Sequence, residues 1–135
     1  MNAVLVVAGI MQKDGMIFAA QRNEKAHQGL KWEFPGGKVE KNETPEKALE
    51  RELYEELGIQ TKTGALFSEK THVYPEKTVR VLFYLTEITS GEPKALEANQ
   101  VGWFSKEDLI TLDFSGADGE VAREIFDRMS FQTRI

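Results

Sequence analysis

The stretch of residues 36–59 constrains the fold more than any other part of this chain. Its sequence, GGKVEKNETPEKALERELYEELGI, opens with two glycines and continues into a run rich in glutamate and leucine. Thr44 is a favourable N-cap, Pro45 loses no useful hydrogen bond at the first helical position, and Gly58 favours a left-handed C-cap. The pattern therefore predicts a helix over residues 45–57, preceded by a turn at the two glycines.

One side of this predicted helix is acidic. Glu52, Glu55 and Glu56 stand at i, i+3 and i+4, so their side chains share one face and repel one another. We therefore expect a cation among them, and Mg²⁺ or Mn²⁺ is the natural choice because both prefer carboxylate and carbonyl oxygens. The alternative is a solvated face with an Arg51–Glu55 ion pair, worth only about 0.2–0.5 kcal/mol. The adjacent glycine pair favours the metal site.

The composition limits the remaining possibilities. A chain of 135 residues with 41% hydrophobic and 29% charged residues predicts one soluble domain spanning residues 1–135. No run is long enough to cross a bilayer, and the apolar start lacks the features of a secretion signal. The absence of cysteine excludes disulfides and fits a cytoplasmic protein. A net charge of −5 argues against binding to a nucleic-acid polymer, but it is compatible with a single nucleotide as partner.

Hydrophobic periodicity predicts strands and helices in mixed order. Strands are expected at 3–11, 16–22, 65–74 and 78–89 and in a short segment within 97–104, and helices at 45–57, after Ser105 and at 118–129. Both faces of the strand at 78–89 are partly apolar, so we expect it to be covered on both sides. The predicted fold is α/β (α+β), with helices on both faces of a mixed sheet.

At this point a family resemblance can be recognised. Gly37, Glu43 and the run RELYEELGI at 51–59 match the Nudix box at every fixed position. The segments WEFPGGK at 32–38 and EANQVGW at 97–103 resemble the MutT branch of nucleoside-triphosphate pyrophosphohydrolases. The resemblance covers most of the chain and implies a Nudix-type α/β/α sandwich with a mixed central sheet. It also implies an Mg²⁺-dependent enzyme that splits (d)NTPs into (d)NMP and pyrophosphate, with 8-oxo-dGTP as the leading substrate.

The resemblance also implies roles for individual residues. It assigns metal binding to the Gly36 carbonyl and to Glu52, Glu55, Glu56 and Glu97. The assignment of Glu97 as a metal ligand depends on the resemblance alone, because a lone acid in a loop is otherwise more often a surface group. Glu52 is our preferred general base, with Glu97 as the rival, since crowded acids raise one another's pKa. Arg51 is expected to orient a glutamate, with Glu43 as its partner.

Lys38 and Arg22 are the expected phosphate contacts. Lys38 follows the glycine pair, and Arg22 ends a strand that the family directs at the cleft. Without the resemblance, Arg22 would be interpreted as a solvated strand end. The segment is not a P-loop, because Trp32 stands where the first glycine of that motif belongs.

Four residues are candidates for contact with the base. Phe34, Tyr74 and Val79 fall where the MutT branch packs the base, although each could be part of the core. Asp118 stands where guanine-selective enzymes of this branch usually have Asn. An ionised Asp only accepts hydrogen bonds, which suits the amino group of cytosine or adenine. Alternatively, Asp118 caps the last helix.

Several functions therefore stay open. The alternatives are a CTP or 5-modified (d)CTP pyrophosphohydrolase and a Nudix enzyme acting on nucleotide sugars, dinucleoside polyphosphates or capped RNA. A non-catalytic nucleotide sensor is a further class, against which the intact box argues. A monomer and a homodimer are both compatible with the sequence.

Overall fold

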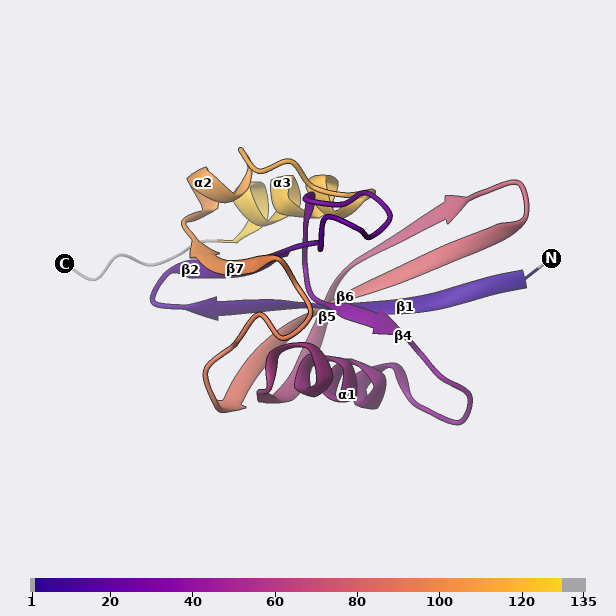
Figure 1. Ribbon diagram of the computed structural model, residues 1–135, viewed down its shortest axis with the longest axis horizontal. Coiled ribbons are helices and arrows are strands. Elements are labelled where there is room, and N and C mark those ends of the chain that lie inside the picture. Colours follow the sequence, from indigo (N-terminus) through magenta and orange to yellow (C-terminus); the bar gives the residue numbers. More distant parts are fainter. Residues whose placement is uncertain (1, 130–135) are drawn as a thin grey trace.

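The computed structural model describes residues 2–129, in which a mixed sheet lies between helices (Figure 1). The strands are β1 (Asn2–Lys13), β2 (Met16–Gln21), β3 (Trp32–Glu33), β4 (Gly36–Lys38), β5 (Gln60–Val73), β6 (Lys77–Ser90) and β7 (Gln100–Phe104). The helices are α1 (Pro45–Leu57), α2 (Lys106–Leu109) and α3 (Asp118–Arg128). In the described part of the chain, no helix is long and apolar enough to cross a membrane.

Strand β1 is the centre of the sheet. It pairs in parallel with β6 along most of its length, and antiparallel with β4 at Val6–Ala8 and with β2 at its end. The strand order is β3-β2-β1-β6-β5, with β4 attached to β1 and β7 attached to β2. One parallel pair among antiparallel ones makes the sheet mixed, which confirms the prediction.

The helices cover opposite faces of the sheet (Figure 1). Helix α1 buries Leu49, Leu53 and neighbouring residues in one apolar cluster, and α3 buries Val121 and Ile125 in another. Strand β6 contributes to both clusters, because its consecutive buried residues point to alternate faces. The α/β/α sandwich and the two-sided cover of β6 are therefore confirmed.

The bounds and caps of helix α1 are those that the sequence predicts. The Thr44 hydroxyl accepts a hydrogen bond from the Lys47 N–H at 3.2 Å. At the other end Gly58 has a φ of 71°, and its N–H donates to the Tyr54 carbonyl. These caps fix where α1 begins and ends, and burial of its leucine stripe fixes which side its glutamates face.

The predicted glycine turn is wrong. Gly36 and Gly37 lie in strand β4 and have no positive φ; they pair with Ala8 and Val7 of β1. A Cβ on Gly36 would stand 1.9 Å from the Val7 carbonyl oxygen. The glycines are therefore required by close packing of two strands, and not by a change of chain direction.

Strand β5 begins five residues earlier than predicted. The strand runs from Gln60 and contains Gly64 at an irregularity in the pairing register between Thr63 and Leu66. A Cβ on Gly64 would stand 2.8 Å from the Leu85 carbonyl oxygen, so this glycine also marks a close approach of two strands.

Candidate active site

A cleft of about 390 Å³ lies where β1, β2, β3 and β4 meet the end of α1. It brings together seven of the predicted site residues: Arg22, Phe34, Gly36, Lys38, Glu56, Glu97 and Asp118. Glu52 and Glu55 on α1 are not part of this lining; Glu52 contacts Gly37, which is, and both glutamates accept hydrogen bonds from Arg51. A larger hollow of about 800 Å³ near the end of β6 shares none of these residues. The cleft is therefore the part of the described chain that corresponds to the predicted site.

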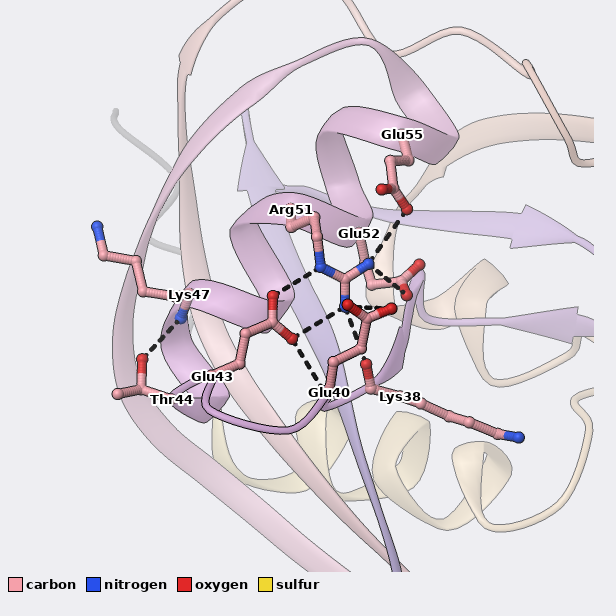
Figure 2. A network of polar contacts seen from close by, with 8 residues as sticks. All are labelled: Lys38, Glu40, Glu43, Thr44, Lys47, Arg51, Glu52 and Glu55. Atoms are coloured by element: carbon pink, nitrogen blue, oxygen red, sulfur yellow. Dashed lines mark hydrogen bonds and ion pairs between the residues drawn. The ribbon is translucent and has the colours of Figure 1, made fainter.

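At one end of the cleft, Arg51 holds a network of acidic groups (Figure 2). Its Nε donates to Glu43 at 2.6 Å, and its Nη1 donates to Glu52 at 3.1 Å and to Glu55 at 3.2 Å. Its Nη2 donates to the Lys38 carbonyl at 3.1 Å, which joins α1 to β4. The hydrogen bond to Arg51 lowers the pKa of Glu43. This geometry agrees with the expectation that Glu43 is the partner of Arg51 and that Arg51 orients a glutamate.

The carboxylate of Glu52 lies directly against Gly37. A Cβ on Gly37 would stand 2.4 Å from the carboxyl carbon of Glu52. No side chain larger than hydrogen is therefore compatible with this position of Glu52. Together, Gly37 on one side and Arg51 on the other fix where the Glu52 carboxylate lies.

Among the clustered acids, Glu56 has the strongly raised pKa. Burial raises the pKa of Glu56 to about 9, assisted by a hydrogen bond with Glu52 and by the charges of Glu33 and Glu97. Burial is the main cause of this raised pKa, and the neighbouring carboxylates add to it. The influence of Glu97 on Glu56 also means that the loop before β7 brings Glu97 to the acidic end of the cleft.

The acidic end has the chemistry of a cation site without a complete set of ligands. In residues 2–129 no three acidic or histidine side chains form a ready-made set around one ion. The donors are nevertheless all oxygens, and burial with too few positive charges keeps Glu56 protonated at neutral pH. A divalent cation would offset exactly this excess of negative charge, with its coordination completed by other oxygens such as those of a phosphate. The residues present therefore fit a hard divalent cation.

Arg22 is held by the protein itself. Its Nε donates to the His27 carbonyl at 2.7 Å and its Nη1 donates to Glu33 at 2.8 Å. The backbone of Arg22 is also bonded, because its N–H donates to the Lys31 carbonyl. Arg22 reaches the cleft as expected, but two of its three guanidinium nitrogens already have partners.

Glu33 was missed by the sequence reasoning. It lines the cleft, and burial raises its pKa while its hydrogen bond with Arg22 opposes the rise. Its position on β3, paired with Ala20 of β2, is not visible in any local pattern. The only available signal was its place between Trp32 and Phe34, an acid within an otherwise apolar segment.

The other end of the cleft is formed by Phe34 and Asp118. Phe34 is buried and stacks on Phe114, with ring centroids 5.3 Å apart. The Asp118 carboxylate accepts the Phe34 N–H at 2.8 Å, and burial raises the pKa of Asp118 to about 7. The N-cap of α3 is Ala117, and no side chain caps this helix. The interpretation of Asp118 as a helix cap is therefore wrong.

The structure does not bring Tyr74 and Val79 to this cleft. Tyr74 lies at the turn between β5 and β6 and is 40% exposed, and its ring is tilted against that of His72 with the centroids 4.3 Å apart. Val79 pairs with Val4 of β1 and also lies outside the lining. Val81, two residues further along β6 and on the same face of the strand, lines the cleft instead. The prediction located the right strand face but the wrong residue on it.

A family model described as the NUDIX domain matches residues 1–127. The chain belongs to the Nudix family. Nudix hydrolases generally use divalent metal ions, in agreement with the oxygen donors of the acidic end. The helix that carries Arg51 and its glutamates is thus the Nudix helix, and the fold is the Nudix fold.

Individual Nudix relatives give a finer comparison. The chain is 36% identical over 126 residues to an 8-oxo-dGTP diphosphatase of Escherichia coli K12, covering 93% of this chain and 98% of that protein. It is 34% identical over 118 residues to a CTP pyrophosphohydrolase of the same strain, covering 87% of each. The solution structure of the E. coli ORF135 protein matches with a TM-score of 0.83 at 30% identity, over 97% of this chain and 96% of that one.

Proposed function

We propose that this Nudix hydrolase splits nucleoside triphosphates into a monophosphate and pyrophosphate, with 8-oxo-dGTP as the leading substrate. The observation that carries the proposal is the two-ended cleft. Acidic oxygens gather at one end, and an aromatic ring with an aspartate lies at the other. A triphosphate and its base need these two environments within one cleft. The relative named 8-oxo-dGTP diphosphatase supports this choice of substrate.

Mg²⁺ is the proposed cofactor, with Mn²⁺ as a substitute. The Gly36 carbonyl, Glu52, Glu56 and Glu97 would hold it, together with Glu55 at the exposed rim. When bound, the ion would neutralise phosphate oxygens and lower the pKa of a water molecule.

The side chains would then act on the reaction as follows. Glu52, held by Arg51 and packed against Gly37, accepts the proton of the attacking water. The water oxygen forms a bond to phosphorus, and the bond to the α–β bridging oxygen breaks, so the leaving group departs with that electron pair. Glu97 is the rival proton acceptor. Lys38, the exposed last residue of β4, is proposed to contact the phosphates, with Arg22 contributing from the position directly after β2.

Cytidine triphosphates are the second candidate substrates because of Asp118. One carboxylate oxygen of Asp118 accepts the Phe34 N–H, and the other can accept an amino group such as cytosine N4. The relative named CTP pyrophosphohydrolase supports this alternative. An Asp118→Asn variant would then shift the preference from dCTP toward 8-oxo-dGTP by about 10-fold in kcat/KM, since one good base contact contributes roughly 1–3 kcal/mol.

The test is a phosphate-release assay with added pyrophosphatase and Mg²⁺. The panel contains 8-oxo-dGTP, dGTP, dCTP, 5-methyl-dCTP and dATP, compared by kcat/KM, with EDTA as the control for the metal. Release of AMP from ADP-ribose in preference to these would favour a nucleotide-sugar hydrolase. The absence of product from every compound would favour a nucleotide sensor. A cytoplasmic location and a monomeric or homodimeric state stay predictions from the sequence.

A further inference from the structure

We propose that Gln21 is a positioning residue that holds the Glu97 loop against the cleft. The inference rests on the proposed function, because it concerns how Glu97 reaches the acidic end. Gln21 is the last residue of β2, immediately before Arg22. Its side chain forms hydrogen bonds to two separate loops that border the cleft.

The first connection is to the segment that follows Glu97. The Gln21 Oε1 accepts from the Asn99 side chain at 2.6 Å and from the Gln100 side chain at 2.9 Å. The Asn99 N–H also donates to the Gln21 carbonyl at 2.9 Å. Two side chains and one main-chain group within three positions of Glu97 are therefore hydrogen-bonded to Gln21.

The other side of the same loop is fixed to helix α1. The Leu96 N–H donates to the Glu56 carbonyl at 3.3 Å, and the Lys94 N–H donates to the Leu57 carbonyl at 3.0 Å. Glu97 thus lies between an attachment to α1 on one side and the attachment to Gln21 on the other. Because its own side chain is exposed, the position of Glu97 depends on these two attachments rather than on burial.

The second connection is to the loop between β2 and β3. The Gln21 Nε2 donates to the Leu30 carbonyl at 3.0 Å, and the Leu30 N–H donates to the Arg22 carbonyl. Leu30 has a φ of 65°, a left-handed conformation that is unusual for a bulky residue and persists only where neighbouring contacts hold it. One amide therefore satisfies three partners and links the two loops that border the cleft.

The decisive experiment uses Gln21→Met, which keeps the length of the side chain and removes its hydrogen bonds. Mn²⁺ affinity, measured by electron paramagnetic resonance, and kcat/KM on the preferred triphosphate should each fall by about 10-fold, as expected for a residue that orients a ligand. Gln12→Met is the matched control, since Gln12 is an exposed glutamine at the end of β1, and it should leave both unchanged. Asn99→Ala should lower Mn²⁺ affinity and kcat/KM by a smaller factor, and it replaces Gln21→Met as the test variant if Gln21→Met fails to fold.

The same substitution in a protein that also carries Glu97→Gln distinguishes a positioning role of Gln21 from a general effect on stability. In Glu97→Gln, adding Gln21→Met should cause little further loss of Mn²⁺ affinity, because both changes remove the contribution of the Glu97 carboxylate to Mn²⁺ binding. An equal loss with and without Glu97 would overturn the proposal, as would wild-type Mn²⁺ affinity in Gln21→Met. A wild-type protein that hydrolyses no triphosphate would instead refute the proposed function, and the Mn²⁺ measurement would still decide the role of Gln21.

Discussion

The two ends of the cleft are built in different ways. At the acidic end Arg51 joins Glu43, Glu52 and Glu55 and the Lys38 carbonyl, all within 13 positions of it along the chain. At the base end the contact that defines the geometry joins Phe34 to Asp118, which are 84 positions apart. The acidic end is therefore determined by one capped helix and the strand before it, whereas the base end exists only once the whole sheet has formed.

This difference predicts different sensitivities. A change at the acidic end displaces charged groups that hold one another, so it should affect the chemical step. A change at the base end alters one contact on a scaffold that other residues support, so it should affect substrate preference and pH dependence. The following predictions test whether the two ends are separable in this way.

The largest effect is expected for Glu52→Gln. The amide can still accept a hydrogen bond from Arg51, but it cannot take a proton from water, so kcat should fall by about 10²–10⁴-fold. The thermal midpoint should stay close to that of the wild type. Glu107→Gln, an exposed acid on α2, is the control and should leave kcat unchanged. Near-normal turnover in Glu52→Gln would transfer the role of base to another acid such as Glu97.

Gly37→Ala should produce the next largest effect. The added Cβ would stand 2.4 Å from the Glu52 carboxyl carbon, so Glu52 must move. A displacement of about 1 Å at a reacting group lowers the rate by roughly 100-fold. Gly119→Ala is the matched change at the base end, where the Cβ would meet Phe114 at an ordinary 3.6 Å.

Steady-state kinetics give kcat for the two alanine variants, and their thermal midpoints show whether the two are equally stable. The difference in kcat then measures how differently the two ends of the cleft affect the chemical step. Gly119→Ala should retain the wild-type kcat. A large loss of kcat in both variants would mean that the two ends of the cleft are mechanically coupled, and would contradict the claim that they are separable.

Arg51→Lys should have a smaller effect on kcat, about 10-fold. An ammonium keeps the positive charge but cannot reach Glu43, Glu52 and the Lys38 carbonyl at once, as the planar guanidinium does. The thermal midpoint should change little, because lysine keeps a positive charge beside the half-buried carboxylates of Glu43 and Glu52. Lys47→Arg, on the exposed side of α1, is the control for exchanging lysine and arginine on this helix, and it should leave kcat unchanged. An unchanged kcat in Arg51→Lys would show that charge alone suffices at this position.

The same contrast decides what could be predicted from the sequence. Helical periodicity and capping gave the bounds of α1 and its acidic face, because both follow from local geometry. The pairing of Arg51 with Glu43 came from the resemblance to the Nudix box, and the structure shows that hydrogen bond. The two glycines were assigned to a turn, whereas the structure places them in strand β4. Their requirement comes from Val7 on another strand and from Glu52 on the helix, and such tertiary contacts leave no periodic signal.

The base end was predicted less well for the same reason. Val79 was named from the family resemblance, and the register that places Val81 instead of Val79 in the cleft depends on pairing with β1. Glu33 was overlooked, because only the fold brings it beside Arg22 and into the cleft. The sequence leaves Asp118 open between base contact and cap. Only the fold shows that Ala117 is the N-cap of α3 with no side-chain cap, and that the Asp118 carboxylate accepts the Phe34 N–H.

The smallest expected effect is on stability, in Asp118→Asn. Burial raises the pKa of Asp118 to about 7 from its ordinary value of 3.8, assisted by the charge of Glu33 and opposed by Arg22 and the Phe34 N–H. The folded state therefore binds this proton more tightly than the unfolded state does. Its contribution to stability is complete below about pH 4 and is lost as the pH rises through 7.

Asparagine is neutral throughout and can still accept the Phe34 N–H. The free energy of unfolding of Asp118→Asn relative to wild type should therefore rise between pH 5 and pH 8, by about 1–3 kcal/mol for a half-buried carboxyl. Urea denaturation at the two pH values measures this change. Asp127→Asn, an exposed acid on the same helix, should show no such dependence. A flat difference for Asp118→Asn would mean that the base end tolerates the charged carboxylate, and that Asp118 is ionised when it meets the substrate.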